Sequence, residues 1–172
     1  SGGVTSDYDR KFADQLIRGE VNEQNIPHTF ADGRIDWFYN PTREDPNLPI
    51  NNEWQWQLNR MSYWPNLGRA YRATGNEKYA QAFVAHLRSW AEQCPRPDDH
   101  GNYAQSPWRT IESGIRMARN WPDTYTLFVD SPSLTDDDVL LFLKLCIEHG
   151  KHLRANHRER GNWLTMEMAG LY

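Results

Sequence analysis

Cysteine is scarce in this 172-residue sequence, which holds only Cys94 and Cys146, far apart along the chain. Their spacing excludes a disulfide framework and a zinc knuckle built on paired cysteines, so we expect two free, buried thiols. None of the six histidines is joined by a carboxylate or a cysteine at metal-ligand spacing, and no metal site is predicted. Long apolar runs are missing too. Because a membrane-spanning helix needs about 20 consecutive apolar residues, we expect no membrane partner.

An excess of basic charge is also lacking. Lysine and arginine number 19 against 23 aspartates and glutamates, a net charge of −4, which argues against a nucleic-acid partner. Four cations nevertheless gather in the segment before Asn162, namely Lys151, Arg154, Arg158 and Arg160. Two interpretations remain open for them: a solvated helix end favoured by the helix dipole, or the positive rim of a cleft for an anionic substrate.

Strand patterns are nearly absent, while helical ones are frequent. Short alternation occurs in "HTFADGRIDWFYNP", where Asp32-Gly33 predicts at most a small hairpin. Elsewhere apolar residues recur at helical spacing, as in Tyr79, Phe83, Leu87 and Trp90. Capping residues such as Thr135 mark helix starts. The pattern predicts an all-α chain of antiparallel helical hairpins, arranged either in a ring, as an α/α toroid, or in a line, as a solenoid.

The sequence is rich in aromatic residues, with eight tryptophans and eight tyrosines. Most such side chains belong in a core, but a carbohydrate cleft also keeps many of them exposed. Five segments, in order "GRIDWFYNP", "NNEWQWQLNRMSYWPNLGRAYRATGNEKYAQAF", "SWAEQCP", "SPWRTIESGIRMARNW" and "GNWLTMEMAGLY", resemble the N-terminal domain of the heparinase II/III family of polysaccharide lyases. Residues 30–172 carry the resemblance, and residues 1–29, a leader and a first helix, match weakly.

This resemblance implies both a fold and a domain context. The family's N-terminal domain is an incomplete α/α toroid of antiparallel helical hairpins, followed by a large antiparallel β-sandwich domain. We therefore expect residues 30–172 to form the first part of such a toroid, with the β-sandwich domain lying outside this sequence. No cofactor is implied for these residues, and the question of a metal in the β-sandwich domain stays open.

The resemblance also implies a reaction. Family members cleave uronic-acid-containing polysaccharides by β-elimination, in which the uronate carboxylate must be neutralised before the neighbouring C5 proton can be removed. An asparagine at the start of a helix performs this neutralisation, and the matching residue here is Asn162. Many relatives carry histidine at the next position, where this sequence has Trp163. The family's catalytic tyrosine and histidine would lie beyond Tyr172. On capping statistics alone, Asn162 after Gly161 is instead an ordinary helix N-cap.

Candidate substrate-binding residues surround this asparagine in the expected cleft. Arg109, Glu112 and Arg116 share one helix face, either as a surface ladder of ion pairs or with Arg109 holding a sulfate or carboxylate. We favour a mixed arrangement in which Glu112 and Arg116 form a buried pair. One of Trp54 and Trp56 must face the core, and the other is free to act as a sugar platform. The predicted substrate-binding set is Trp54, Asn59, Arg60, Tyr103, Gln105, Trp108, Arg109, Arg158, Arg160 and Trp163.

The resulting functional hypothesis is the N-terminal part of a lyase for heparin or heparan sulfate, located in the periplasm or secreted. The acidic polysaccharide is its expected partner, and residues 1–172 alone should be inactive. An alginate or other polyuronate lyase of the same family is the first alternative, and a non-catalytic carbohydrate-binding module is the second. A glycoside hydrolase is disfavoured, because no convincing pair of cleft carboxylates is present.

Overall fold

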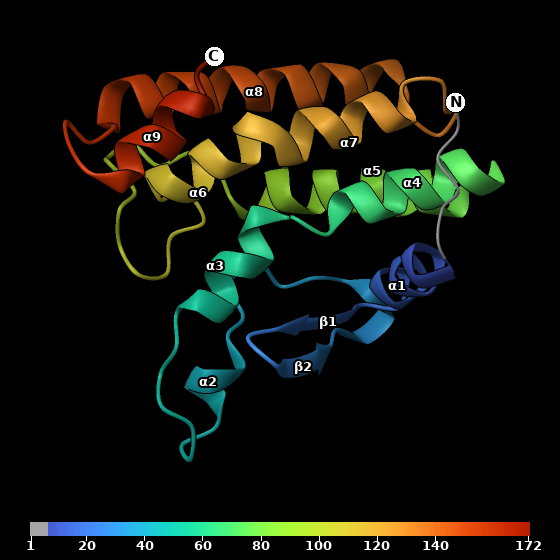
Figure 1. Cartoon of the computed structure of the whole chain (residues 1–172), viewed down its shortest axis with the longest axis horizontal. Helices are drawn as coiled ribbons and strands as arrows, with labels where there is room; N and C mark the ends of the chain where they lie inside the picture. Colours follow the sequence, from blue (N-terminus) through green and yellow to red (C-terminus); the bar gives the residue numbers. More distant parts are fainter. Residues whose placement is uncertain (1–6) are drawn as a thin grey trace.

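The computed structural model describes residues 7–172 and is mostly helical (Figure 1). Its longer helices are α1 (Asp7–Ile17), α3 (Glu53–Arg60), α4 (Trp64–Thr74), α5 (Lys78–Gln93), α7 (Trp121–Phe128), α8 (Asp136–Asn156) and α9 (Asn162–Ala169). Shorter elements are the helices α2 (Pro41–Glu44) and α6 (Thr110–Ile115), the 3-10 turn η1 (Ala31–Gly33), the π-helical turn η2 (Arg116–Asn120), and the strands β1 (Glu20–Glu23) and β2 (Ile26–Thr29). The all-α prediction is confirmed. Within residues 7–172, no helix has the length and apolar character needed to cross a membrane.

Antiparallel helical hairpins make up the body of the molecule. Helices α4 and α5 form one hairpin, and α4 packs against α7 while α5 packs against α8 (Figure 1). Helices α7 and α8 form another, in contact through the stacked rings of Tyr125 and Phe142. Local signals define their ends. Gly75 terminates α4 in the left-handed conformation at φ 65°, and Thr135 and Asp138 form a capping box at the start of α8. The hairpin arrangement agrees with the expected first part of a toroid.

The small hairpin lies earlier in the chain than predicted. Strands β1 and β2 pair antiparallel, with Glu20 opposite Thr29. Their connection uses Gln24 and Asn25 at φ 54° and 60°, the pair of positive values that a two-residue type I′ turn requires. Asp32-Gly33 instead belongs to the 3-10 turn η1. The prediction was wrong because it relied on the Asp-Gly pair, whereas Asn25 tolerates the left-handed conformation nearly as well.

Two prolines lie at turns or helix starts. Ser106-Pro107 has the form of a helix start, but the Ser106 hydroxyl accepts a hydrogen bond from the Trp108 amide at 3.0 Å, and α6 begins only at Thr110. Pro65 stands in the first turn of α4, after Met61 has ended α3 at φ 52°. In each case the proline occupies a turn or a first helical turn, where its missing N–H costs nothing.

Helix α9 packs on α6 through backbone contacts at two glycines. A Cβ atom at Gly114 would lie 2.4 Å from the carbonyl oxygen of Met166, and one at Gly170 would lie 2.7 Å from Gly114 Cα. Both distances are shorter than any real contact of that kind, so a side chain at either position would push α9 away from α6. The contact fixes where α9, and with it Asn162, lies relative to the rest of the chain.

Tryptophans dominate the core. Six are buried to below 2% exposure: Trp37, Trp54, Trp64, Trp90, Trp108 and Trp121. Both cysteines are free, as predicted, although burial is complete only for Cys94. Burial raises the pKa of the Cys94 thiol to about 12. It therefore packs as a small apolar group instead of acting as a reactive thiolate.

Candidate functional site

Arg116 lies inside the aromatic core, with all its nitrogens hydrogen-bonded to neutral acceptors. Its Nε donates to His149 Nε2 at 3.0 Å, Nη1 to the Asn59 carbonyl at 3.0 Å and Nη2 to Ser113 Oγ at 3.2 Å. The guanidinium also lies 4.8 Å from the Trp90 ring centroid. Burial lowers the pKa of Arg116 to about 10, so it remains a cation at neutral pH. This environment is complete without a ligand.

Glu112 is fully buried between two other arginines. Its Oε1 lies 2.8 Å from Arg60 Nη2, and its Oε2 lies 3.4 Å from Arg109 Nε. Glu112 and Arg116 are both buried, as predicted, but no ion pair joins them in the part of the chain that the structure describes. The predicted direct pairing is wrong, because the Glu112 carboxylate contacts Arg60 and Arg109 instead. Its charge still acts on Arg116, where it opposes the lowering of the pKa by burial.

Arg109 belongs to a stack of alternating aromatic and cationic side chains. Its guanidinium carbon lies 3.4 Å from the Trp56 ring centroid and 4.8 Å from that of Trp163. On Trp163, the Arg158 guanidinium lies at 3.8 Å. We call these four residues (Trp56, Arg109, Trp163 and Arg158) the arginine–tryptophan stack. It joins α3, the segment before α6, and α9, and it ends on the exposed side chain of Arg158.

Hydrogen bonding in this stack is incomplete. Arg109 is 6% exposed, yet its Nη1 has no hydrogen-bond partner among the described residues. Burial is the main cause of the lowered pKa of Arg109, with Glu112 opposing it. Stacking on indole faces favours a cation electrostatically while leaving the in-plane N–H groups free. The stack therefore holds a guanidinium in a fixed orientation with bonding capacity unused.

Asn162 is the first residue of α9 and does not cap it. The N-cap is Gly161, at φ 92°, and no side chain closes the helix end. The Asn162 side chain is exposed and makes no hydrogen bond to the described residues. The capping interpretation is wrong, because Asn162 is the first residue inside the helix and Gly161 holds the N-cap position. Its role as carboxylate neutraliser stays a prediction.

Three residues of the predicted substrate-binding set lie in the core instead. Trp54 donates its indole N–H to the Ile26 carbonyl at 2.9 Å, and Trp108 donates to the Cys94 carbonyl at 2.8 Å. Asn59 is held by the Trp37 carbonyl at 2.8 Å and by the Trp90 indole at 3.0 Å. All three are buried to 1% exposure or less. The expectation that they contact substrate is wrong, since their polar groups are bonded and no surface remains to meet a sugar.

The remaining members of the set lie at or near the stack. Arg60 reaches it through Glu112. Tyr103 and Gln105 are exposed and flank Ala104, whose carbonyl accepts the Trp56 indole N–H at 2.9 Å. Arg160 is exposed in the segment that leads into α9.

Trp56 was not in the predicted set, although one of the pair Trp54 and Trp56 was expected to be free of the core.

The basic segment before Asn162 does not lie on one exposed surface throughout. Lys151 and Arg154 are exposed, whereas the intervening His152 is buried and bonds the Trp108 carbonyl at 2.7 Å.

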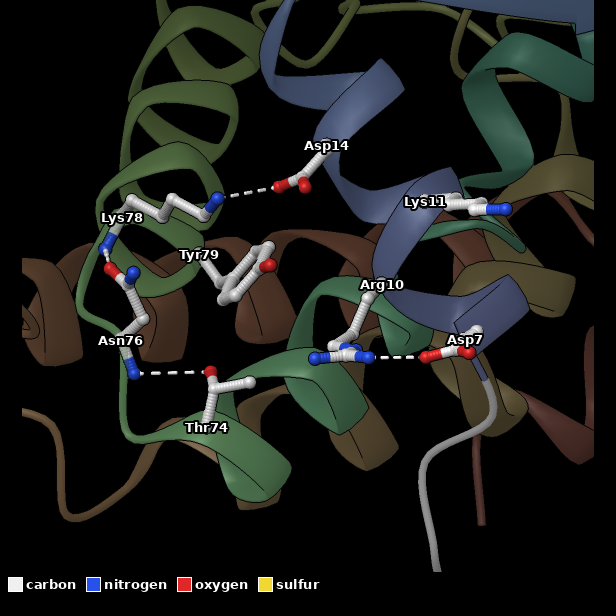
Figure 2. A pocket seen from close by; sticks show the side chains of 8 residues that line it. All are labelled: Asp7, Arg10, Lys11, Asp14, Thr74, Asn76, Lys78 and Tyr79. Carbon is white, nitrogen blue, oxygen red and sulfur yellow. Dashed lines mark hydrogen bonds and ion pairs between the residues drawn. The ribbon is translucent and has the colours of Figure 1, made fainter.

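A separate hollow between α1 and the start of α5 is lined by charged residues. The hollow has a volume of about 360 Å³. Figure 2 shows the residues that line it, namely Asp7, Arg10, Lys11, Asp14, Thr74, Asn76, Lys78 and Tyr79. Lys78 pairs with Asp14 at 2.7 Å, and Arg10 pairs with Asp7 (Figure 2). Both carboxylates of the hollow are already paired, with Arg10 and with Lys78, and none of its elements contributes to the arginine–tryptophan stack. The stack together with Asn162 is therefore the better candidate site.

Comparison with known proteins finds a matching family and several similar proteins. A family model described as the heparinase II/III N-terminus matches residues 4–172. A heparin-sulfate lyase from Pedobacter heparinus is 32% identical over 159 residues, covering 92% of this chain and 23% of that protein. Another from Bacteroides thetaiotaomicron is 35% identical over 138 residues, covering 80% of this chain and 18% of that protein.

Solved structures of proteins with similar names also match this chain. The crystal structure of a heparan sulfate lyase from Pedobacter heparinus matches with a TM-score of 0.79 and 28% identity, over 95% of this chain and 24% of that one. A structure described as heparinase III matches with a TM-score of 0.79 and 25% identity, over 94% of this chain and 25% of that one. The chain thus spans no more than a quarter of the length of these relatives. The predicted division of the chain at residue 30 stays a prediction.

Proposed function

The chain belongs to the heparinase II/III family, and from that membership we propose that it is the N-terminal part of a lyase that cleaves heparin or heparan sulfate by β-elimination. The observation that carries the proposal is the free, exposed amide of Asn162 next to a preorganised stack of arginines and tryptophans. Two of the relatives described above are heparin-sulfate lyases by name.

The proposed chemistry gives Asn162 the task of neutralising the uronate carboxylate. Its side-chain N–H₂ group would donate to that carboxylate, and this interaction strengthens as negative charge develops when the C5 proton leaves. A carboxamide bonded to its own helix end could not do so, which is why the absence of a capping role matters. We propose that the base and the acid that move the protons lie beyond Tyr172.

The arginine–tryptophan stack would bind the acidic polysaccharide. Arg158 presents its guanidinium on the outer face of Trp163, and a guanidinium can hold a sulfate or carboxylate with two parallel hydrogen bonds. Four exposed cations lie in the segment before Asn162, namely Lys151, Arg154, Arg158 and Arg160. Their concentration favours a sulfated glycosaminoglycan over alginate, which carries carboxylates only. An enzyme for such a substrate would work in the periplasm or outside the cell.

The test is a comparison of substrates on the full-length protein. Heparan sulfate, alginate and hyaluronan are supplied separately, and the ultraviolet absorbance of the unsaturated uronate product is followed. We expect product from heparan sulfate and none from the other two. Product from alginate alone would overturn the choice of substrate. Binding of heparan sulfate without any rise in absorbance would favour the carbohydrate-binding module, which is the competing function that the stack itself could serve.

A further inference from the structure

A buried carboxylate on α9 holds the segment that leads into this helix. Glu167 is fully buried, and its Oε2 accepts a hydrogen bond from the backbone N–H of Arg158 at 2.8 Å. We propose that Glu167 is a positioning residue: it anchors residues 157–161 and so holds Arg158 in the stack and Asn162 beside it. The inference rests on the proposed function where it concerns turnover, but the anchor itself is a property of the chain.

The segment needs such an anchor because its backbone is otherwise weakly restrained. Gly161 has φ 92°, and glycine adopts positive φ values about as readily as negative ones, so its own backbone preference does not hold this conformation. The C-terminal half of α9 is fixed on α6 by the contacts of Gly114 and Gly170. In the part of the chain that the structure describes, no such contact fixes Gly161, since a Cβ atom there would meet nothing within 4 Å. The hydrogen bond from the Arg158 N–H to Glu167 attaches that segment to α9, which is itself fixed on α6.

Arg158 is thereby held at two points. Its backbone is bonded to Glu167, and its side chain lies on Trp163, the residue after Asn162. The two contacts set the direction in which the chain enters α9, and with it the place of the Asn162 side chain. Loss of the backbone anchor would leave only the stacking contact, which permits sliding across the ring.

The chemical nature of Glu167 argues against a merely space-filling role. Its other oxygen, Oε1, is buried without a hydrogen-bond partner among the described residues. A buried polar atom left unpaired costs stability, and an apolar side chain of similar size would pack without that cost. A carboxylate at this position is explained by the need for a strong acceptor for the Arg158 amide. Full burial also means that Glu167 does not itself touch substrate.

The experiment compares three variants of the full-length protein. Glu167→Met removes the acceptor at similar side-chain volume, and Glu167→Gln keeps one oxygen that can accept the same hydrogen bond. Glu159→Met is the matched control, because Glu159 lies in the same segment but is exposed. Should Glu167→Met fail to fold, Glu167→Asp replaces it, since the shorter side chain keeps the charge but loses the reach. Two quantities are measured: hydrogen exchange at the Arg158 amide, and kcat and KM on heparan sulfate.

We expect Glu167→Met to speed exchange at the Arg158 amide by at least about tenfold, because that N–H loses its acceptor. The same variant should lower kcat by about 10- to 10²-fold, the range for a catalytic group displaced by about 1 Å, with KM changing less. Glu167→Gln should restore most of both quantities, and Glu159→Met should change neither. Unchanged exchange in Glu167→Met would refute the anchor, and faster exchange with an unchanged kcat would refute the positioning role. If the wild-type protein forms no product, the proposed function fails, and the exchange rates alone decide whether Glu167 holds the segment.

Discussion

Arg109 and Arg116 flank the same short helix, α6, and both lie against tryptophan rings, yet their surroundings differ in one respect. Every nitrogen of Arg116 donates to an acceptor within the core. Arg109 shares a carboxylate with Arg60 and leaves Nη1 unpaired. A buried cation with a hydrogen bond at every nitrogen is fully held by the fold, whereas one with an unbonded nitrogen is prepared for a further partner. Hydrogen-bond completeness, more than burial or aromatic contact, separates the structural arginine from the candidate binding arginine.

The largest effect should come from the unbonded amide next to the incomplete site. In the full-length protein, Asn162→Ala should lower kcat by about 10²–10³-fold, the usual cost of losing one charge-stabilising donor. Its melting temperature should stay close to that of the wild type, because Asn162 caps no helix end. Thr165→Ala, at an exposed position of the same helix, serves as the control and should leave kcat unchanged. A clear loss of stability with normal kcat would return Asn162 to a structural role.

The two arginines can be compared directly by replacing each with methionine. Arg116→Met leaves His149 Nε2 and the Asn59 carbonyl without a donor inside the core, at about 1–3 kcal/mol for each unsatisfied group. We expect it to lower the free energy of unfolding in urea by about 3 kcal/mol. Arg109→Met should cost only about 1 kcal/mol, because Glu112 keeps Arg60, but it should weaken binding of heparan sulfate. Equal losses of stability in the two variants would remove the distinction between them.

His86 tests how the core tolerates an ionisable group that lacks the partners of Arg116. It is buried with Nδ1 unpaired, and burial lowers its pKa from 6.5 to about 4. Between these two values the unfolded chain binds the proton and the folded chain does not, so stability should fall as the pH falls from 6.5 to 4. The difference between the two pKa values corresponds to a loss on the order of 3 kcal/mol in the free energy of unfolding when the pH falls through this range. Melting temperatures at pH 7 and pH 4.5 check this, and His86→Leu should show a smaller acid loss than the wild type.

The smallest expected effect concerns Glu23, a partly buried carboxyl at the end of β1. Burial raises its pKa to about 7, and Arg60, which also serves the stack through Glu112, opposes the rise. The folded chain holds this proton more tightly than the unfolded chain. The contribution of protonated Glu23 to the free energy of unfolding is therefore present below pH 4.5 and is lost as the pH rises through 7. Glu23→Gln should therefore raise stability by about 1–2 kcal/mol at pH 8, after allowing for solvent screening, and by little at pH 4. An equal gain at both pH values would show that the carboxyl does not titrate in this range.

Local features of the fold could be predicted from the sequence. The N-cap Thr135 stands where the pattern placed it, because a cap acts through residues within one helical turn. The hairpin was misplaced by one turn signal, since Gln24-Asn25 and Asp32-Gly33 differ little in local preference.

The candidate site could be predicted only in part. Trp54 and Trp56 are separated by a single residue, so they point about 200° apart around α3, and the pattern requires one of them to leave the core. Which of the two does so depends on Ile26 and Ala104, whose carbonyls accept the two indole N–H groups. Both partners come from elsewhere in the chain.

The sequence by itself determined the all-α class, the Thr135 cap, the family and the place of Asn162 at the start of a helix, because these depend on neighbours in sequence or on motifs read in order. Only the tertiary structure decided which arginine has its donors satisfied, which tryptophan faces the core, and that Glu167 holds the Arg158 amide. These outcomes depend on contacts between α3, α6, α8 and α9. Hydrogen bonds and desolvation act over a few ångströms in space, so their partners are set by how distant segments pack, and no spacing along the chain records that.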